Sequence, residues 1–61
     1  MCEANAYMIR DGEEELLMEA VDKIEPEDDG LRLVNIFGDQ KFIHAHIHAL
    51  FFVNHKILLK E

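Results

Sequence analysis

The chain has 61 residues, of which 49% are hydrophobic, and its thirteen acidic and six basic side chains give a net charge of −7. This length predicts a single domain, residues 1–61, and the apolar content excludes a disordered tail. The negative charge disfavours general binding to nucleic acid, and the longest apolar run, residues 49–53, is too short to span a membrane.

The first half of the chain predicts a β-hairpin. Residues 2–10 alternate small or apolar side chains with polar ones, so the even-numbered positions 2–8 should share one face of a strand. The dipeptide Asp11-Gly12 favours a two-residue turn, which makes residues 14–18 the partner strand. However, residues 13–24 also carry apolar side chains at helical spacing, so an α-helix in this stretch is an alternative.

The second half predicts short strands separated by turns. Pro26 is expected to end the preceding element, and residues 27–30 have the composition of a turn. β-Branched and aromatic residues predict the later strands, and Gly38-Asp39 and Asn54-His55 predict turns between them. The expected strands are residues 31–37, 40–48 and 56–60. The recurring turns are typical of a small all-β barrel or sandwich.

The size of the chain predicts that it does not act alone. A domain this short buries little of its surface, and small domains usually add disulfides, a metal or a second subunit. Cys2 is the only cysteine, which excludes an internal disulfide and favours a reducing compartment. No secretory signal is recognisable at the start of the sequence, so we expect a cytoplasmic protein that uses a partner subunit, a metal or both.

Cys2 is the candidate metal ligand. Removal of Met1, which is usual before a small side chain, would leave an α-amine and a thiol on one residue, and both can lose a proton to a metal at neutral pH. Thiolate and nitrogen donors suit nickel, copper or zinc, and two Cys2 residues at a dimer axis would suit a square-planar nickel site. If Met1 stays, amide nitrogens replace the amine. The alternative is that Cys2 packs as a small apolar side chain.

Three histidines form a second candidate. His44, His46 and His48 alternate with apolar residues, so on one strand their imidazoles would share a face and adjacent pairs could bind nickel or zinc. Alternatively, the same face is simply solvated while the intervening apolar side chains cover the core. His55 follows Asn54 and is expected to be a turn residue rather than a ligand.

No pattern of catalytic residues is present. The sequence contains no phosphate-binding loop, nucleophile elbow or paired acid and base, so we expect no enzymatic activity. An alternative function is that of a small-barrel RNA-binding module. In that hypothesis the histidines, Lys41, Lys56 and Lys60 line a strand edge, and Phe51 or Phe52 stacks on bases.

Four segments of the sequence resemble the CooT family, small nickel-binding accessory proteins associated with maturation of carbon monoxide dehydrogenase. The likeness covers essentially the whole chain. Its most specific feature is the combination of a Met-Cys start with a hydrophobic-Phe-Gly-acid turn. The segments are Met1–Ala4, Val21–Glu25, Leu31–Asp39 and Val53–Leu59.

The resemblance implies a small SH3-like β-barrel of five to seven short strands that forms a homodimer, with strands rather than a helix at residues 13–24. It also implies one Ni(II) per dimer, held by Cys2 of each subunit. The implied role is nickel storage or delivery for carbon monoxide dehydrogenase or its nickel-loading machinery. A metal role for the three histidines is not part of the resemblance and would be particular to this protein.

Overall fold

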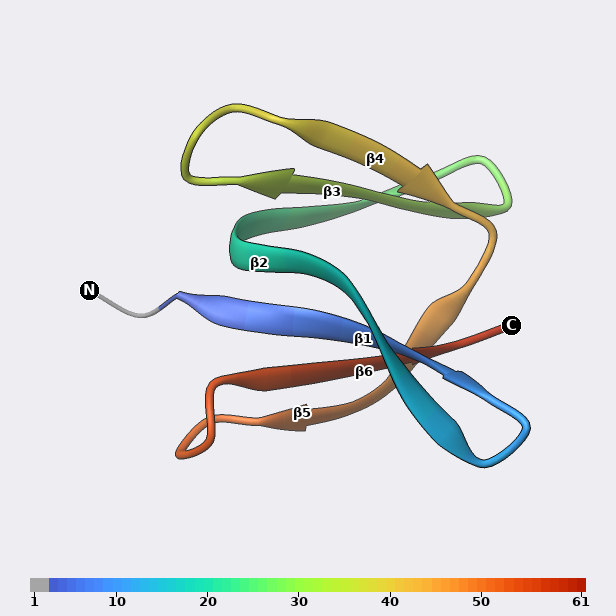
Figure 1. Cartoon of the computed structure of the whole chain (residues 1–61). Coiled ribbons are helices and arrows are strands. Elements are labelled where there is room, and N and C mark those ends of the chain that lie inside the picture. The colour runs from blue at the N-terminus through green and yellow to red at the C-terminus, as the bar shows by residue number, and fades with distance from the viewer. Residues whose placement is uncertain (1–2) are drawn as a thin grey trace.

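The computed structural model describes residues 3–61, which form six β-strands in one sheet (Figure 1). The strand order is β4-β3-β2-β1-β6-β5, and every neighbouring pair is antiparallel except β1 with β6. The strands are β1 (Ala4–Arg10), β2 (Glu13–Glu27), β3 (Gly30–Asn35), β4 (Gln40–Ile43), β5 (His46–Phe51) and β6 (Lys56–Lys60). The all-β prediction and the expected number of strands are confirmed. Residues 3–61 contain no helix that could span a membrane.

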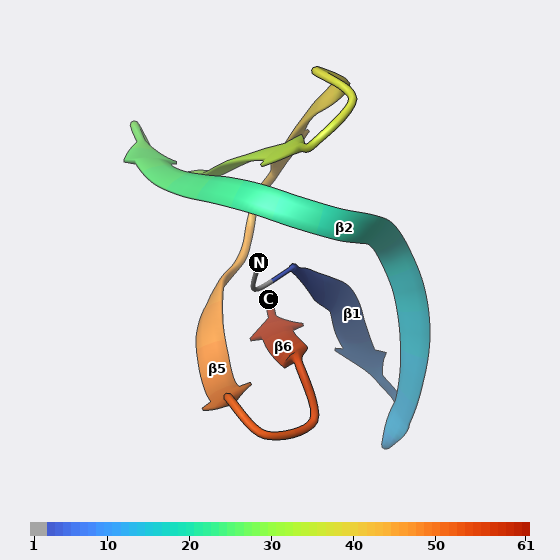
Figure 2. The same cartoon turned by 90° about the vertical axis from the view of Figure 1, so that its left-hand side faces the viewer.

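The sheet curls around one apolar core. Figure 2 shows β2 bending sharply, so that its first half lies beside β1 and its second half crosses above β1 and β6. β4 and β5 are the two edges of the sheet, and the chain passes from one edge to the other through residues 44–45. The buried core residues are Ala6, Met8, Met18, Val21, Leu31, Leu33, Ile57 and Leu59.

Register shifts against β1 and against β3 bend β2 and explain why its sequence resembles a helix. Ala6 pairs with Met18, whereas Ala4, two residues earlier, pairs with Val21, three residues later. Each extra residue in β2 shifts the alternation of side chains and increases the local bend. As a result, the inward positions Met18, Val21 and Ile24 recur every third residue, a spacing that fits a helix better than a strand. The helical alternative for residues 13–24 is therefore excluded.

Hydrogen bonds stabilise the bulge of β2 between Met18 and Val21. Ala20 has a φ of 55°, and its N–H donates to Oδ1 of Asn5 in β1 at 3.2 Å. The carbonyl of Ala20 accepts a hydrogen bond from the N–H of Ile36 at 3.0 Å. The bulge thus connects the start of β1 with the turn that follows β3.

The predicted hairpin turns are present, with one correction. Asp11 and Gly12 both have positive φ, as a two-residue type I′ turn requires. The prediction that Pro26 ends its element is wrong, because β2 continues to Glu27. Among residues 3–61, β1 pairs with β2 only as far as Val21. One edge of β2 therefore has no strand beside it near Pro26 in this part of the chain, and a residue without an N–H is tolerated there.

The predicted strand 40–48 is divided in two. β4 ends at Ile43 and β5 begins at His46, with the N–H of Ala45 donating to the Ile43 carbonyl at 3.0 Å. This break lets the chain cross between the sheet edges. The strand predicted at 31–37 ends earlier, at Asn35, whose Oδ1 accepts hydrogen bonds from the N–H groups of Phe37 and Asp39.

Candidate metal site and its surroundings

The predicted ligand Cys2 lies outside the residues that the structure describes, but the segment that follows it is well placed. Glu3 is exposed, and Ala4 begins β1. The N–H of Asn5 donates to the His55 carbonyl at 2.9 Å, which ties the start of β1 to the turn between β5 and β6. The described chain therefore begins at a fixed point on one end of the sheet.

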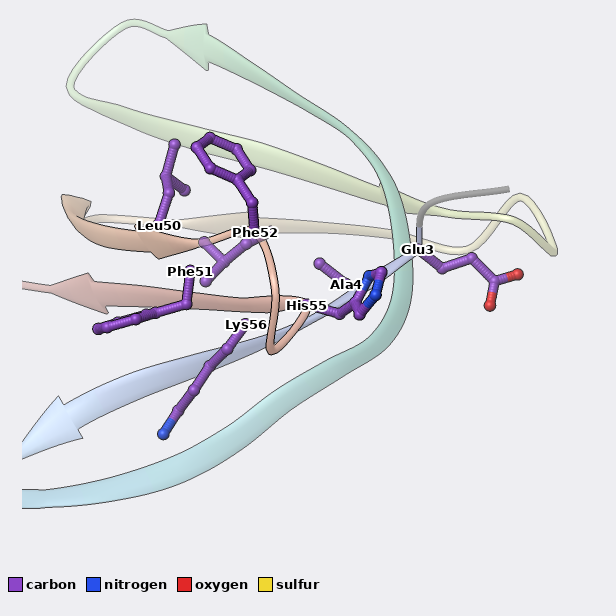
Figure 3. Close-up of a pocket in the computed structure, with 8 residues that line it drawn as sticks. Glu3, Ala4, Leu50, Phe51, Phe52, His55 and Lys56 are labelled. Carbon is purple, nitrogen blue, oxygen red and sulfur yellow. The ribbon is translucent and has the colours of Figure 1, made fainter.

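Two hollows lie on either side of this point, and Glu3 and His55 line both. The first has a volume of ≈ 230 Å³ and a mainly apolar wall, which includes Ala4, Leu50 and Phe52. Figure 3 shows the His55 ring beside Ala4, while the Glu3 side chain points away from the hollow. The second hollow has a volume of ≈ 460 Å³ and a more polar wall.

Exposed apolar side chains gather at the same end of the molecule. Phe37 lies in the turn between β3 and β4, and Phe52 and Val53 lie in the turn between β5 and β6; all three are strongly exposed. Figure 1 shows both turns on the side from which the N-terminus emerges. The sequence analysis gave Phe52 a role only in the RNA-binding hypothesis, as a residue that stacks on bases, and gave Phe37 and Val53 no individual role. The available signal was the presence of large apolar side chains within turn segments.

The residues described provide no metal site of their own. Within residues 3–61 no group of three or more His, Cys, Asp or Glu side chains is arranged to hold a metal ion. Any metal site in this protein that uses three or more such side chains must therefore include Cys2 or a residue from another chain. An acidic cage for a hard cation such as calcium is not formed by this part of the chain.

The three alternating histidines do not share one strand face. His44 lies before β5, with its Nδ1 3.4 Å from Oδ1 of Asp29 and its ring edge-on to Phe42. His46 and His48 are in β5, but a bulge near His48 interrupts the alternation. The predicted row of imidazoles on one strand is wrong, and the exposure of all three side chains agrees with the solvated alternative. His55 lies in a turn with a φ of 54°, as the turn prediction implied.

The three lysines of the RNA-binding hypothesis do not line one strand edge. Lys41 is in β4, whereas Lys56 and Lys60 are in β6, and three strands separate β4 from β6 in the sheet. Nζ of Lys41 donates to the Leu17 carbonyl at 3.1 Å, and Lys56 pairs with Glu14. Two of the three cations are therefore already engaged within the protein.

Comparison with known proteins finds similarity over nearly the whole chain. The family model for CO dehydrogenase accessory protein CooT matches residues 1–60. A crystal structure of a protein from Carboxydothermus hydrogenoformans, assigned as CooT, superimposes with a TM-score of 0.93 at 48% sequence identity, covering 98% of this chain and 97% of the other. A comparison with curated proteins gives no significant match. The similarity includes both the sheet and the sequence that precedes it.

Proposed function

The chain belongs to the CooT family of CO dehydrogenase accessory proteins, and from this we propose that it is a cytoplasmic, nickel-binding homodimer. In this role it stores Ni(II) or delivers it to CO dehydrogenase or to the nickel-loading machinery of that enzyme. It carries the metal as cargo and catalyses no reaction. The observation that carries the proposal is the family match, which begins at residue 1 and includes the only cysteine.

The chemistry of the available donors supports Cys2 as the ligand. Nickel prefers thiolate and nitrogen donors to carboxylates and water. Residues 3–61 contain no cluster of three or more His, Cys, Asp or Glu side chains that could hold a metal ion, and Cys2 is the only thiolate donor in the sequence. Two Cys2 residues from two subunits supply two thiolates, and the α-amine or backbone amides near them complete a planar set.

The surroundings of the first described residues are compatible with a shared site. The start of β1 is held at one end of the sheet by the hydrogen bond between Asn5 and His55, and Glu3 is exposed. An exposed Glu3 leaves the start of the described chain open to a second subunit and to an acceptor protein. Metal binding by both subunits would also stabilise the dimer by mass action.

Nickel titration of a Cys2→Ser variant tests this function. We expect the wild-type protein to bind one Ni(II) per two chains with a thiolate charge-transfer absorption, because a thiolate is the principal donor. Cys2→Ser should lose this absorption and most of the nickel affinity. The absorbance titration and native mass spectrometry of the intact protein measure absorption, affinity and stoichiometry together.

A variant that lacks the three histidines at alternate positions provides the control. His44→Ala, His46→Ala and His48→Ala combined remove three exposed imidazoles and should leave the absorption and the stoichiometry unchanged. Nickel binding by Cys2→Ser as tight as that of the wild type would disprove the proposed site. Loss of the absorption in the histidine variant would instead show that His44, His46 or His48 takes part in the site.

A further inference from the structure

The apolar core is incomplete along β5. Leu59 and Ile57 of β6 face the core and are 0% and 9% exposed. Their partners in β5 are Ile47 and Leu50, and directly paired side chains lie on the same face of a sheet. Ile47 and Leu50 are nevertheless 43% and 45% exposed. These two inward-facing side chains thus lack the cover that their neighbours in β6 have.

The uncovered side chains belong to a larger apolar surface, which we call the β5 patch. Figure 3 shows Leu50 and Phe52 pointing to the same side of β5 and Phe51 pointing to the other, so the patch surrounds the free edge of this strand. The hollow of ≈ 230 Å³ lies within it, beside Ala4. The β5 patch consists of Ile47, Leu50, Phe51, Phe52 and Val53.

The charge distribution indicates which partner can cover the β5 patch. Residues 40–60 contain no aspartate or glutamate, although the chain as a whole has thirteen. Two copies that met through most other surfaces would bring carboxylates together, and like charges in contact are costly. Contact through the β5 patch brings only Glu3 close to the interface, and its side chain points away from the hollow in Figure 3. This contact therefore reduces the repulsion between carboxylates and covers apolar area on both copies.

The size of the chain agrees with such an interface. A specific interface of standard size covers about 800 Å² on each partner. The accessible surface of this chain is 4270 Å², so an interface of that size would take about a fifth of it. In a closed dimer the same patch is used by both copies.

We propose that the β5 patch is the surface through which two copies of this chain associate, with the two-fold axis beside the Phe51 end of β5. This inference rests on the homodimer of the proposed function and adds its location. Glu3 and Ala4 line the same hollow as Leu50 and Phe51, so an axis there brings the starts of both β1 strands together. An axis at the β1–β2 turn, at the opposite end of the molecule in Figure 1, would separate them.

Leu50→Glu and Phe52→Glu test the location, with Leu16→Glu as the matched control. Leu16 is 49% exposed, close to the 45% of Leu50, but lies in β2 beside acidic residues. We expect each patch variant to raise the dimer dissociation constant at least about tenfold, because a carboxylate would face its copy across an apolar interface. The control should change it by less than about twofold. Sedimentation velocity over a range of protein concentrations measures the constants.

The outcomes separate this inference from the proposed function. Phe52 is 81% exposed in a turn, so its variant should keep the wild-type circular dichroism and report on association alone. If both patch variants dimerise like the wild type, or if Leu16→Glu dissociates equally, the location is wrong while the nickel-binding homodimer stands. A wild-type chain that stays monomeric with and without Ni(II) overturns the homodimer as well.

Discussion

β5 and β6 are neighbouring strands with similar apolar content and opposite burial. β6 lies between β1 and β5, and its three central residues are buried. β5 is the edge of the sheet, and five of its six residues are exposed. The side chains that face the core from the two strands are of the same type, so the difference comes from the position of each strand in the sheet.

This difference separates residues that hold the monomer together from residues available to a partner. Full burial of an aliphatic side chain contributes about 1.5–3 kcal/mol relative to exposure. Leu59 gains this stabilisation within the monomer, whereas Leu50 gains only part of it. In the proposed dimer the remainder becomes association free energy. Three predictions test this comparison of β5 with β6, the packing of β4 at the other edge of the sheet, and the hydrogen bond at the start of β1.

The largest expected effect is that of Leu59→Ala. This change removes a side chain without solvent exposure and leaves a cavity, so it should lower the free energy of unfolding by about 3 kcal/mol. Leu50→Ala, in the adjacent strand, should lower it by about 1 kcal/mol because its side chain is already half exposed. Urea denaturation, at protein concentrations low enough to keep the chain monomeric, compares the free energies of unfolding of the two variants. Equal losses would mean that β5 is as well packed as β6.

Gly30→Ala examines the other edge of the sheet. A Cβ at Gly30 would lie 2.3 Å from the Ile43 carbonyl oxygen and 2.8 Å from Cζ of Phe42, so β4 would have to move away from β3. We expect a loss of about 2 kcal/mol in the free energy of unfolding. Gly12→Ala is a useful comparison, because no atom lies within 4 Å of its Cβ position and only its φ of 78° opposes the change. Gly12→Ala should lower the free energy of unfolding by about 1 kcal/mol.

Thermal denaturation followed by circular dichroism measures both glycine variants. If Gly30→Ala is no less stable than Gly12→Ala, then β4 does not depend on its close contact with β3. In that case the two sheet edges would be equally loosely held. The expected order instead makes β4 a fixed edge and β5 the edge that is free for a partner.

The sequence predicted the fold where the signals were local. The Asp11-Gly12 turn and the alternation in β1 depend on a few adjacent residues, and both predictions are confirmed. The bulges in β2 depend on contacts with Asn5 and Ile36, which are distant in the sequence. The parallel pairing of β1 with β6 joins the two ends of the chain, and no local pattern predicts it.

For the candidate site, the sequence indicates a candidate ligand, Cys2, which stays a prediction, and it does not indicate the surroundings of that residue. Cys2 was selected because it is the only cysteine and is close to the start of the chain. Phe37 and Phe52 come from two turns that lie at the same end of the molecule, the end from which the N-terminus emerges, only after the sheet has formed. The proposed row of three histidines failed because the break at Ala45 separates His44 from β5. Strand boundaries of this kind depend on the curvature of the whole sheet.

The smallest expected effect is that of Asn5→Ala, which concerns the end of β1 beside the β5 patch. The change removes the oxygen that accepts the hydrogen bond from the Ala20 N–H and should lower the free energy of unfolding by about 1 kcal/mol. Asn5→Asp keeps an acceptor oxygen at this position and should lose less. Hydrogen exchange of the Ala20 amide measures the effect directly. Equal exchange rates in the two variants would show that apolar packing of β1, rather than this hydrogen bond, fixes the start of the chain next to the surface proposed for dimerisation.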